Sequence, residues 1–275
     1  MLTILIPVRD EIENLNNIVQ KFNENLTSIN YEVIFVNDFS SDSTLEEVKK
    51  ICNINKKYKV FNNQKKGLGG ALNLGIEKAE GKYICIMMSD LSDDINDLIK
   101  YYKIMNEKDI DAVFGSRFLG TSKTKDYPIN KLILNRIFNI FVKLIYFRSY
   151  NDYTNAFKIY RSDVLKSFIP LFSESFNVFL EIPLKLINRK YKYEVIPINW
   201  SNRKKGKAKF NIKELRSKYL STLIRCYFEK FLIKKWNAFI FAKSNYTFFC
   251  SSIFSADIVY NNSISRHNII EMIQE

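Results

Sequence analysis

Short apolar runs alternate with amphipathic stretches between Met1 and Gly120. The runs have the length of strands that are buried on both faces, and the stretches between them repeat apolar residues at helical spacing. This alternation predicts an α/β fold with a mostly parallel sheet and crossover helices. The expected strands are Leu2–Ile6, Glu32–Asn37, Lys59–Phe61, Tyr83–Met88 and Ala112–Gly115. The expected helices lie near Glu11–Leu26, Ser43–Cys52, Leu68–Ala79 and Ile95–Met105.

The pattern changes after Gly120. A polar loop, Thr121–Pro128, is followed by apolar periods that predict two more strands and three more helices. The helices are expected at Asn130–Phe147, Phe176–Asn188 and Asn211–Lys235, and the strands at Ala156–Tyr160 and Tyr193–Asn199. A Lys- and Gly-rich loop, Ser201–Lys209, separates the last strand from the last helix. We therefore expect one domain over residues 1–210 and a helical C-terminal extension over residues 211–275, of which the part after Lys235 shows no clear period.

Charge and composition narrow the classes of function. Lys and Arg number 42 against 29 Asp and Glu, a net charge of +13, which favours an anionic partner such as nucleic acid, anionic lipid or a phosphorylated small molecule. The four cysteines have no metal-ligand or redox spacing, and the only histidine is His267. These counts argue against histidine-based catalysis and against a Cys/His metal site.

The length of the apolar runs also indicates where in the cell the protein is expected. Met1–Pro7 is too short for a signal peptide, and no stretch reaches the roughly 20 apolar residues that a membrane span requires. The longest candidate, Trp236–Tyr260, is interrupted by Lys243, Asn245 and Asp257. A cytoplasmic protein is expected.

Polar and charged residues follow four of the predicted strands. The strands end in Pro7–Glu11, Asn37–Asp42, Ser89–Asp94 and Gly115–Arg117. Asp and Ser are common in such places as turn residues and helix caps. Because the carboxyl ends of parallel strands share one edge of the sheet, where ligands bind in open α/β sheets, four such segments together indicate a site.

These segments form an ordered series with further glycine-rich and basic pieces. The series is Ile6–Glu11, Val36–Thr44, Gly67–Ala71 with Gly75 and Gly81, Met87–Asp94, Gly115–Phe118, Asp152–Lys158 and Asn202–Phe210. In order and approximate spacing it resembles the family 2 glycosyltransferases of the GT-A (nucleotide-diphospho-sugar transferase) fold, particularly the dolichyl-phosphate mannose synthase-like branch. The resemblance covers residues 1–235 and implies a Rossmann-like sheet, a nucleotide-sugar donor (GDP- or UDP-sugar) and a polyprenyl phosphate acceptor.

The resemblance assigns donor-binding roles to residues at the strand ends. Pro7, Arg9 and Glu11 are expected to line the nucleoside pocket, with Val36 and Asp38 at the base and ribose. Asp38 suits this role because a carboxylate accepts hydrogen bonds from ring N–H groups and ribose hydroxyls. Arg9 stands where the family often has tyrosine, which leaves the identity of the base open.

Asp90 matches the second acid of the family's Asp-x-Asp motif, and Ser89 precedes it in the donor site. A divalent ion held by carboxylate and phosphate oxygens neutralises the charge of a departing diphosphate, which suits Mg²⁺ or Mn²⁺. Met88 occupies the first acidic position, so we expect weaker metal binding at Asp90, with Ser92 or Asp93 as helpers.

Cations are expected against the phosphates. The resemblance implies that the catalytic residues are Asp90, Arg117 and Arg203, which act on the donor. It also implies that the acceptor phosphate is bound by Lys131, Arg203 and Lys209. A guanidinium matches phosphate oxygens bidentately. A hydroxyl acceptor would require a base, for which Asp152 and Glu181 are candidates, whereas a lipid phosphate is already anionic and requires none.

Other interpretations remain open at this point. Transfer to a glycan or other hydroxyl in cell-surface polysaccharide synthesis is the first, and a non-catalytic protein that binds a nucleotide-sugar or nucleic acid is the second. A dinucleotide fingerprint fails because Leu72 replaces its third glycine, and the dispersed basic residues match no nucleic-acid-reading motif. No nucleic-acid partner is therefore expected.

Two predicted helices combine apolar, aromatic and basic residues, in Ile133–Phe147 and Thr222–Phe241. Such helices lie in membrane interfaces, where they can reach a lipid acceptor. We expect peripheral contact with the anionic inner surface of the membrane. Packing of these faces on the domain or in a homodimer is the alternative.

Overall fold

The structure is a computed structural model that describes residues 1–203 and 217–232 of the 275-residue chain. Met1–Lys230 form one compact unit. The domain boundary expected after residue 210 and the segment after Lys235 lie outside the described residues.

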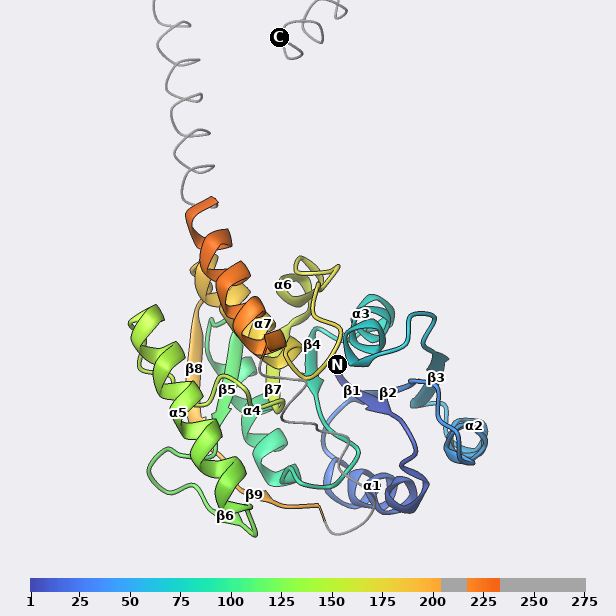
Figure 1. The fold of residues 1–275 in the computed structure, drawn as a ribbon. Coiled ribbons are helices and arrows are strands. Elements are labelled where there is room, and N and C mark those ends of the chain that lie inside the picture. Colours follow the sequence, from blue (N-terminus) through green and yellow to red (C-terminus); the bar gives the residue numbers. More distant parts are fainter. Residues whose placement is uncertain (204–216, 233–275) are drawn as a thin grey trace, which may run out of the picture. The chain divides into compact units, whose positions relative to one another are not determined.

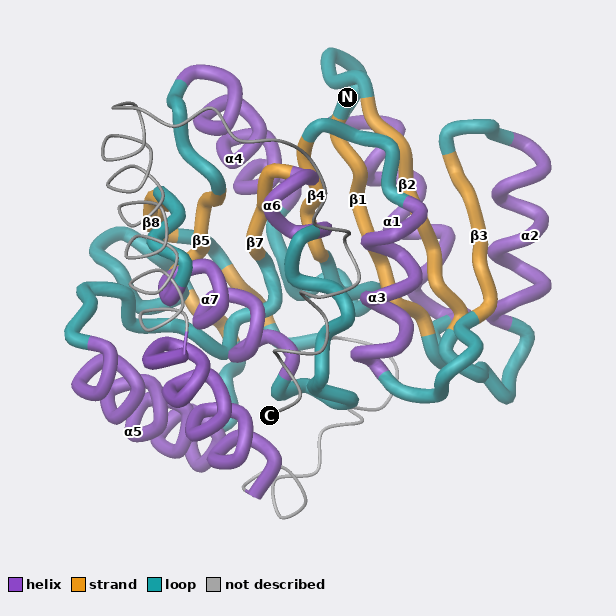
Figure 2. The backbone as a smooth tube through the Cα atoms, turned by 90° about the horizontal axis from the view of Figure 1, so that it is seen from above, coloured by secondary structure: helices purple, strands orange, loops and turns teal. Residues whose placement is uncertain are grey.

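The described residues build a seven-stranded sheet, which Figure 2 shows strand by strand. Its order is β3 (Tyr58–Asn62), β2 (Tyr31–Asn37), β1 (Leu2–Val8), β4 (Tyr83–Ile86), β7 (Lys158–Arg161), β5 (Ala112–Ser116) and β8 (Tyr193–Pro197). The pairs β3–β2, β2–β1, β1–β4 and β5–β8 are parallel, and β7 runs antiparallel to both of its neighbours. Two antiparallel pairings in succession leave β5 parallel to β4, so β1, β2, β4 and β5 end at the same edge.

Helices cover both faces of the sheet. In Figure 1, α1 (Ile12–Asn25), α2 (Thr44–Ile54) and α4 (Ile95–Glu107) lie on one side, and their apolar residues join Ile4, Ile6 and Phe35 in one core. On the other side, α3 (Leu68–Lys78), α6 (Ser162–Lys166) and α7 (Val178–Asn188) pack on Leu5 and Val36. Alternate residues of β1 and β2 thus enter opposite cores, as strands buried on both faces require.

The predicted strands and helices of the first 120 residues are present to within a few residues, and the mostly parallel α/β sheet is confirmed. Three short elements were missed: α6 and the two-stranded pair of β6 (Thr124–Lys125) and β9 (Trp200–Ser201). Two-residue strands carry no periodic signal. Their pairing brings chain segments 76 residues apart in sequence together beside the acidic loop after β4, because Asp93 also forms an isolated bridge with Trp200.

Two helices lie side by side beyond the sheet. They are α5 (Ile129–Tyr146) and the helix of residues 217–232, the described part of the helix expected at Asn211–Lys235. Ring pairs join them, Phe138 with Tyr219 at 5.4 Å and Tyr146 with Tyr227 at 6.4 Å between centroids. Among the described residues, no helix is both long enough and apolar enough to span a bilayer.

Candidate functional site

The loops after β1 and β2 are fastened to each other at the carboxyl edge of the sheet. Asp10 adopts a left-handed backbone (φ 49°), and its Oδ1 accepts hydrogen bonds from the backbone N–H of Ser41 at 2.6 Å and from its hydroxyl at 3.0 Å. Asp38 N–H donates to the Val8 carbonyl at 2.8 Å. The first two predicted site segments therefore form one wall.

Asp38 is held in a fixed orientation. It is 6% exposed, and its Oδ1 accepts from Asn63 Nδ2 at 2.7 Å and from the backbone N–H of Gly67 at 2.8 Å. No described residue donates to Oδ2, which stays available to a ligand. The sequence reasoning missed Asn63, although a signal existed: it directly follows β3, whose carboxyl end lies at this edge.

The glycines at the start of α3, Gly67 as its N-cap and Gly69 in its first turn, allow a close backbone approach. Gly67 has a φ of 122°, and a Cβ on Gly69 would lie 1.7 Å from the carbonyl oxygen of Ser173. Gly69 N–H donates to the Glu174 carbonyl at 3.2 Å. The glycine-rich segment thus joins the start of α3 to the loop before α7, and it presents the Gly67 N–H to Asp38.

The acidic loop follows β4. Asp90 is half-buried, and its Oδ1 accepts from the backbone N–H of Ser92 at 3.1 Å. Ser89, Ser92 and Asp93 are buried. Burial, followed by the nearby charge of Asp90, raises the pKa of Asp93 to about 7. Asp94 begins α4 by accepting from the backbone N–H of Asn96 at 2.9 Å.

The residues of this loop provide only oxygen donors for a metal ion. The described residues include no cluster of three or more His, Cys, Asp or Glu side chains that could coordinate a metal. Asp90 and Ser92 offer one carboxylate and one hydroxyl, the hard ligands that Mg²⁺ and Mn²⁺ accept. Met88 is partly buried against the apolar core and adds no ligand. The donor set fits an ion that takes most of its ligands from a bound diphosphate.

Arg117 and Asp152 form a buried ion pair. Arg117 Nε and Nη2 donate to the two oxygens of Asp152 at 2.9 and 2.7 Å, and the Arg117 backbone N–H adds a third bond at 3.0 Å. The side chains are 8% and 0% exposed. Burial alone would lower the pKa of Arg117, but the Asp152 carboxylate raises it. The rings of Phe118, Tyr127 and Trp200 surround the guanidinium at 5.5–5.7 Å.

This pairing changes the interpretation of both residues. Asp152 accepts through both oxygens and has no contact with solvent, a geometry that does not fit a general base. Glu181 is equally engaged: it is fully buried, accepts from the backbone N–H groups of Phe172 and Ser173, and pairs with Lys185 at 2.8 Å. Its position fits the role of holding the loop beside α3.

Arg203 and Glu11 are joined across the edge of the sheet although they are 192 residues apart. Arg203 Nη2 lies 2.7 and 2.8 Å from the two oxygens of Glu11. Glu11 also accepts from Asn14 Nδ2 at 2.7 Å. Glu11, which was predicted to line the nucleoside pocket, and Arg203, which was predicted to bind phosphate, thus pair with each other in this structure.

The remaining predicted residues fall into three groups. Pro7 and Val36 are register partners inside β1 and β2, and both are buried, so they lie within the sheet just before the strand-end loops. Arg9 lies half-buried in the loop after β1, and Lys131 lies half-buried in the first turn of α5. Lys209 lies outside the described residues.

Sheet order and edge loops define a nucleotide-binding type of α/β protein, in which oriented carboxylates and cations gather beyond the carboxyl ends of parallel strands. Comparison with known families is consistent with this class. The family model "Glycosyl transferase family 2" matches residues 3–169, and the chain belongs to that family.

Similar proteins extend the comparison. The chain is 26% identical over 217 residues to a dolichol-phosphate mannosyltransferase of Pyrococcus furiosus, covering 78% of this chain and 60% of that protein. It is 22% identical to a polyprenol monophosphomannose synthase of Mycolicibacterium smegmatis, covering 78% and 82%. Glucosyl-3-phosphoglycerate synthase of Mycobacterium tuberculosis, solved with UDP, shares the fold with a TM-score of 0.63 at 13% identity, covering 82% and 80%.

Proposed function

We propose that this protein transfers a sugar from a nucleotide-sugar donor to a polyprenyl phosphate, with inversion at the anomeric carbon. Family membership and the two lipid-phosphate mannosyltransferases among the similar proteins support the reaction class. The observation that carries the choice of acceptor is that both candidate bases, Asp152 and Glu181, are buried and fully engaged. An anionic phosphate attacks without losing a proton, whereas a hydroxyl acceptor requires a base.

In the proposed reaction, one phosphate oxygen of the acceptor attacks the anomeric carbon from the face opposite the nucleoside diphosphate. The new carbon–oxygen bond forms as the bond to the diphosphate breaks, and the electron pair leaves with the diphosphate. Asp38 accepts hydrogen bonds from the nucleoside through Oδ2. The charge of Arg117 is balanced by Asp152, and in this proposal the pair fixes the loop after β5 at the edge of the site.

Arg203 contributes differently in this proposal. It must leave Glu11 to bind a phosphate, so donor binding exchanges one carboxylate partner for another anion. Asp90 and Ser92 would hold a divalent ion, Mg²⁺ or Mn²⁺, as solved structures of the Mycobacterium tuberculosis synthase with UDP hold either ion. When bound, such an ion stabilises the charge of the leaving diphosphate.

Transfer of labelled sugar tests the proposal. The purified chain is incubated with GDP-mannose or UDP-glucose, Mn²⁺ and a short-chain polyprenyl phosphate, and the sugar entering the organic phase is counted. We expect product with at least one donor, and a loss of about 100-fold or more in Asp90→Asn, because a transition-state charge loses its counter-ion. Asp109→Asn, at an exposed acid away from the site, is the matched control and should keep full activity.

Two outcomes contradict the acceptor class. Product that forms on a glycan hydroxyl and never on the lipid phosphate favours polysaccharide synthesis instead. Donor binding without any turnover, seen as a rise in melting temperature with UDP or GDP and Mn²⁺, indicates a non-catalytic binding protein.

We further propose that the protein contacts the inner membrane surface through an apolar face on α5 and the helix of residues 217–230. This face consists of Ile129, Ile133, Leu134, Ile137, Ile140, Phe141, Leu144, Phe147, Leu220, Ile224 and Phe228, which are all exposed. The described part of α5 has no acidic residue, and Lys143, Arg225 and Lys230 are exposed near these apolar side chains. An apolar face flanked by cations suits an anionic interface.

Flotation with phosphatidylglycerol vesicles tests this contact. The wild type should float with the vesicles. The double variant Ile137→Ser/Phe141→Ser should stay mostly in the bottom fraction, because it lacks apolar area that the membrane would otherwise bury. Ile54→Ser, at an 86% exposed apolar residue on α2, is the matched control. If the wild type fails to float, and light scattering shows a dimer that only the double variant dissociates, the face is a subunit interface instead.

A further inference from the structure

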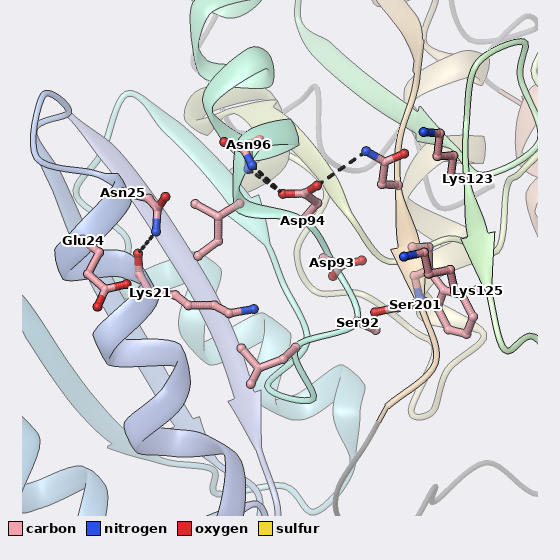
Figure 3. A pocket seen from close by; sticks show the side chains of 14 residues that line it. Lys21, Glu24, Asn25, Ser92, Asp93, Asp94, Asn96, Lys123, Lys125 and Ser201 are labelled. Atoms are coloured by element: carbon pink, nitrogen blue, oxygen red, sulfur yellow. Dashed lines mark hydrogen bonds between the residues drawn. The ribbon is translucent and has the colours of Figure 1, made fainter.

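The surroundings of Asp38 select a ligand more sharply than the cavity beside the acidic loop does. That cavity has a volume of about 520 Å³ and is shown in Figure 3. Its lining sets three acids against three lysines, so it favours neither an anion nor a cation: Glu24, Asp93, Asp94, Lys21, Lys123 and Lys125. Asp38 does not line this cavity, and its own hydrogen bonds at the end of β2 define which base it can accept.

One oxygen of the Asp38 carboxylate is fully occupied by donors of the protein. Oδ1 accepts from Asn63 Nδ2 at 2.7 Å and from the Gly67 N–H at 2.8 Å. A carboxylate oxygen has about two acceptor sites, so Oδ1 has none left for a ligand. Oδ2 has no donor among the residues that the structure describes. A nucleoside that meets Asp38 therefore bonds to Oδ2.

The amide of Asn63 is fixed by its own partners. Its Nδ2 also donates to the Gly67 carbonyl at 3.1 Å, and its Oδ1 accepts from the Lys65 N–H at 3.2 Å. A flipped amide would set its oxygen against two acceptors, Asp38 Oδ1 and the Gly67 carbonyl. Asn63 is 7% exposed, and a Cβ on Gly70 would lie 2.1 Å from the Lys65 carbonyl oxygen, so the turn is tightly packed. A ligand frees Oδ1 only by disrupting this turn.

A carboxylate with one available oxygen matches a base with one ring N–H. Uracil presents a single donor, N3–H, between two carbonyl oxygens. Guanine presents two parallel donors, N1–H and the 2-amino group, which match a carboxylate that offers both of its oxygens. With Oδ1 of Asp38 occupied, the 2-amino group of guanine is left without a partner beside the carboxylate. A buried donor without a partner lowers affinity, and a site discriminates strongly against a ligand that creates one.

We infer that Asp38 and Asn63 together select uracil, so that the donor is a UDP-sugar rather than a GDP-sugar. This inference rests on the proposed function, in which Asp38 accepts a hydrogen bond from the nucleoside. Asn63 is a positioning residue in this scheme, because it acts on the base only through the Asp38 oxygen that it occupies.

Calorimetric titration of the full chain with nucleoside diphosphates and Mn²⁺ tests the inference. UDP should bind at least about tenfold more tightly than GDP, because GDP leaves one donor unpaired. Inosine diphosphate keeps N1–H and lacks the 2-amino group, so it should bind at least as tightly as GDP. UDP methylated at N3 has no ring N–H and should bind about tenfold or more weakly than UDP.

Asn63→Ala tests the positioning role. The variant frees one acceptor site on Asp38 Oδ1, so the preference for UDP over GDP should fall about fivefold or more. A general loosening of the fold would weaken both nucleotides alike, since they share the ribose and the diphosphate, and would leave their ratio unchanged. Asn62→Ala is the matched control: Asn62 is adjacent and exposed, it accepts from Asn37, and its loss should keep the ratio of the wild type.

Four results would overturn the inference. These are GDP that binds as tightly as UDP, GDP that binds more tightly than inosine diphosphate, N3-methylated UDP that binds as tightly as UDP, or an equal UDP-to-GDP ratio in the wild type and Asn63→Ala. Each of them leaves the proposed function standing, because a nucleotide still binds. If neither UDP nor GDP binds at millimolar concentration, the donor pocket of the proposed function is contradicted together with this inference.

Discussion

At the scale of single residues, the pairing of Arg117 with Asp152 has the largest consequence. Each residue was a candidate for direct chemistry, and the structure makes each the partner of the other. A buried ion pair is costly to break, because removing one member leaves an uncompensated charge in a dry environment. Asp152 is therefore best understood as a positioning residue that fixes the end of β5.

The pair can be tested by stability. Asp152→Asn should lower the free energy of unfolding by about 3–5 kcal/mol, since Arg117 stays buried and charged without its carboxylate. The double variant Arg117→Met/Asp152→Leu should be less destabilised than Asp152→Asn, because it leaves no unpaired charge. Urea midpoints of the three proteins provide the measurement. Equal destabilisation of the single and double variants would show that the ion pair is not the cause.

A second residue-scale prediction concerns pH. Glu32 is 4% exposed and accepts hydrogen bonds from Thr3, from Lys59 and from the backbone N–H of Glu80. Burial by itself would raise the pKa of Glu32, but these hydrogen bonds together lower it below its ordinary 4.5. A lowered pKa in the folded state means that the carboxylate stabilises the fold above pH 4.5, and that this contribution is lost as pH falls through the folded value.

Glu32→Gln should therefore be less stable than the wild type by about 1–3 kcal/mol at neutral pH, with a difference that narrows in acid. Urea unfolding at several pH values measures that difference. Glu80→Gln removes an exposed partner of the same lysine and should change stability by under about 1 kcal/mol at any pH. A difference for Glu32→Gln that stays constant down to pH 3, about 1.5 units below the ordinary value, would contradict the assignment.

At the scale of elements, the start of α3 depends on close backbone packing. A methyl group at Gly69 would meet the Ser173 carbonyl oxygen at 1.7 Å, and backbone cannot move aside as a flexible side chain can. The same turn supplies the Gly67 N–H that orients Asp38. The packing of the loop before α7 is therefore coupled to the orientation of the Asp38 carboxylate, which binds the nucleotide in the proposed function.

Gly69→Ala should lower the free energy of unfolding by about 1–3 kcal/mol and weaken UDP or GDP binding, because overpacking shifts the turn that holds Asp38. Chemical denaturation and nucleotide titration measure the two effects. Gly120→Ala is the control: its φ of 48° costs about 1–2 kcal/mol, but its Cβ would meet nothing within 4 Å, so nucleotide affinity should not change. Unchanged affinity in Gly69→Ala would disprove the coupling.

At the scale of the whole molecule, the net charge of +13 and the exposed apolar face act together in the proposed membrane contact. Charge attraction to anionic lipid is screened by salt, whereas burial of apolar side chains is not. The two contributions can therefore be separated in one experiment.

Raising the salt concentration from about 0.05 to 0.5 M should weaken vesicle binding markedly, because the screening length falls from over 10 Å to under 5 Å. A residual fraction should stay bound through the apolar face in the wild type, and none in Ile137→Ser/Phe141→Ser. Co-sedimentation with phosphatidylglycerol vesicles measures both fractions. Binding that is indifferent to salt would exclude the electrostatic part of the proposal.

Much of the fold and part of the site could be predicted from local pattern. The periodicity of apolar residues and the turn residues located the strands β1 to β5 and the helices between them. The expectation that these strands are parallel was enough to place Asp38, Asp90 and Arg117 at one edge of the sheet. Asp38 and Asp90 could be predicted as candidate site residues because each is a carboxylate that follows a predicted strand directly. The roles of Asp152 and Glu181 could not be predicted, since a carboxylate near a site suggests a base until its partners are known.

The sequence by itself determined where strands and helices form, which edge carries the polar loops and which family the chain resembles, because periodicity, turn chemistry and motif order are local properties. Tertiary structure alone decided that β7 enters the sheet antiparallel between β4 and β5, that Arg203 meets Glu11 and that Asn63 orients Asp38. Each of these contacts joins segments at least 25 residues apart or several elements at once, and such contacts leave no periodic trace in the chain.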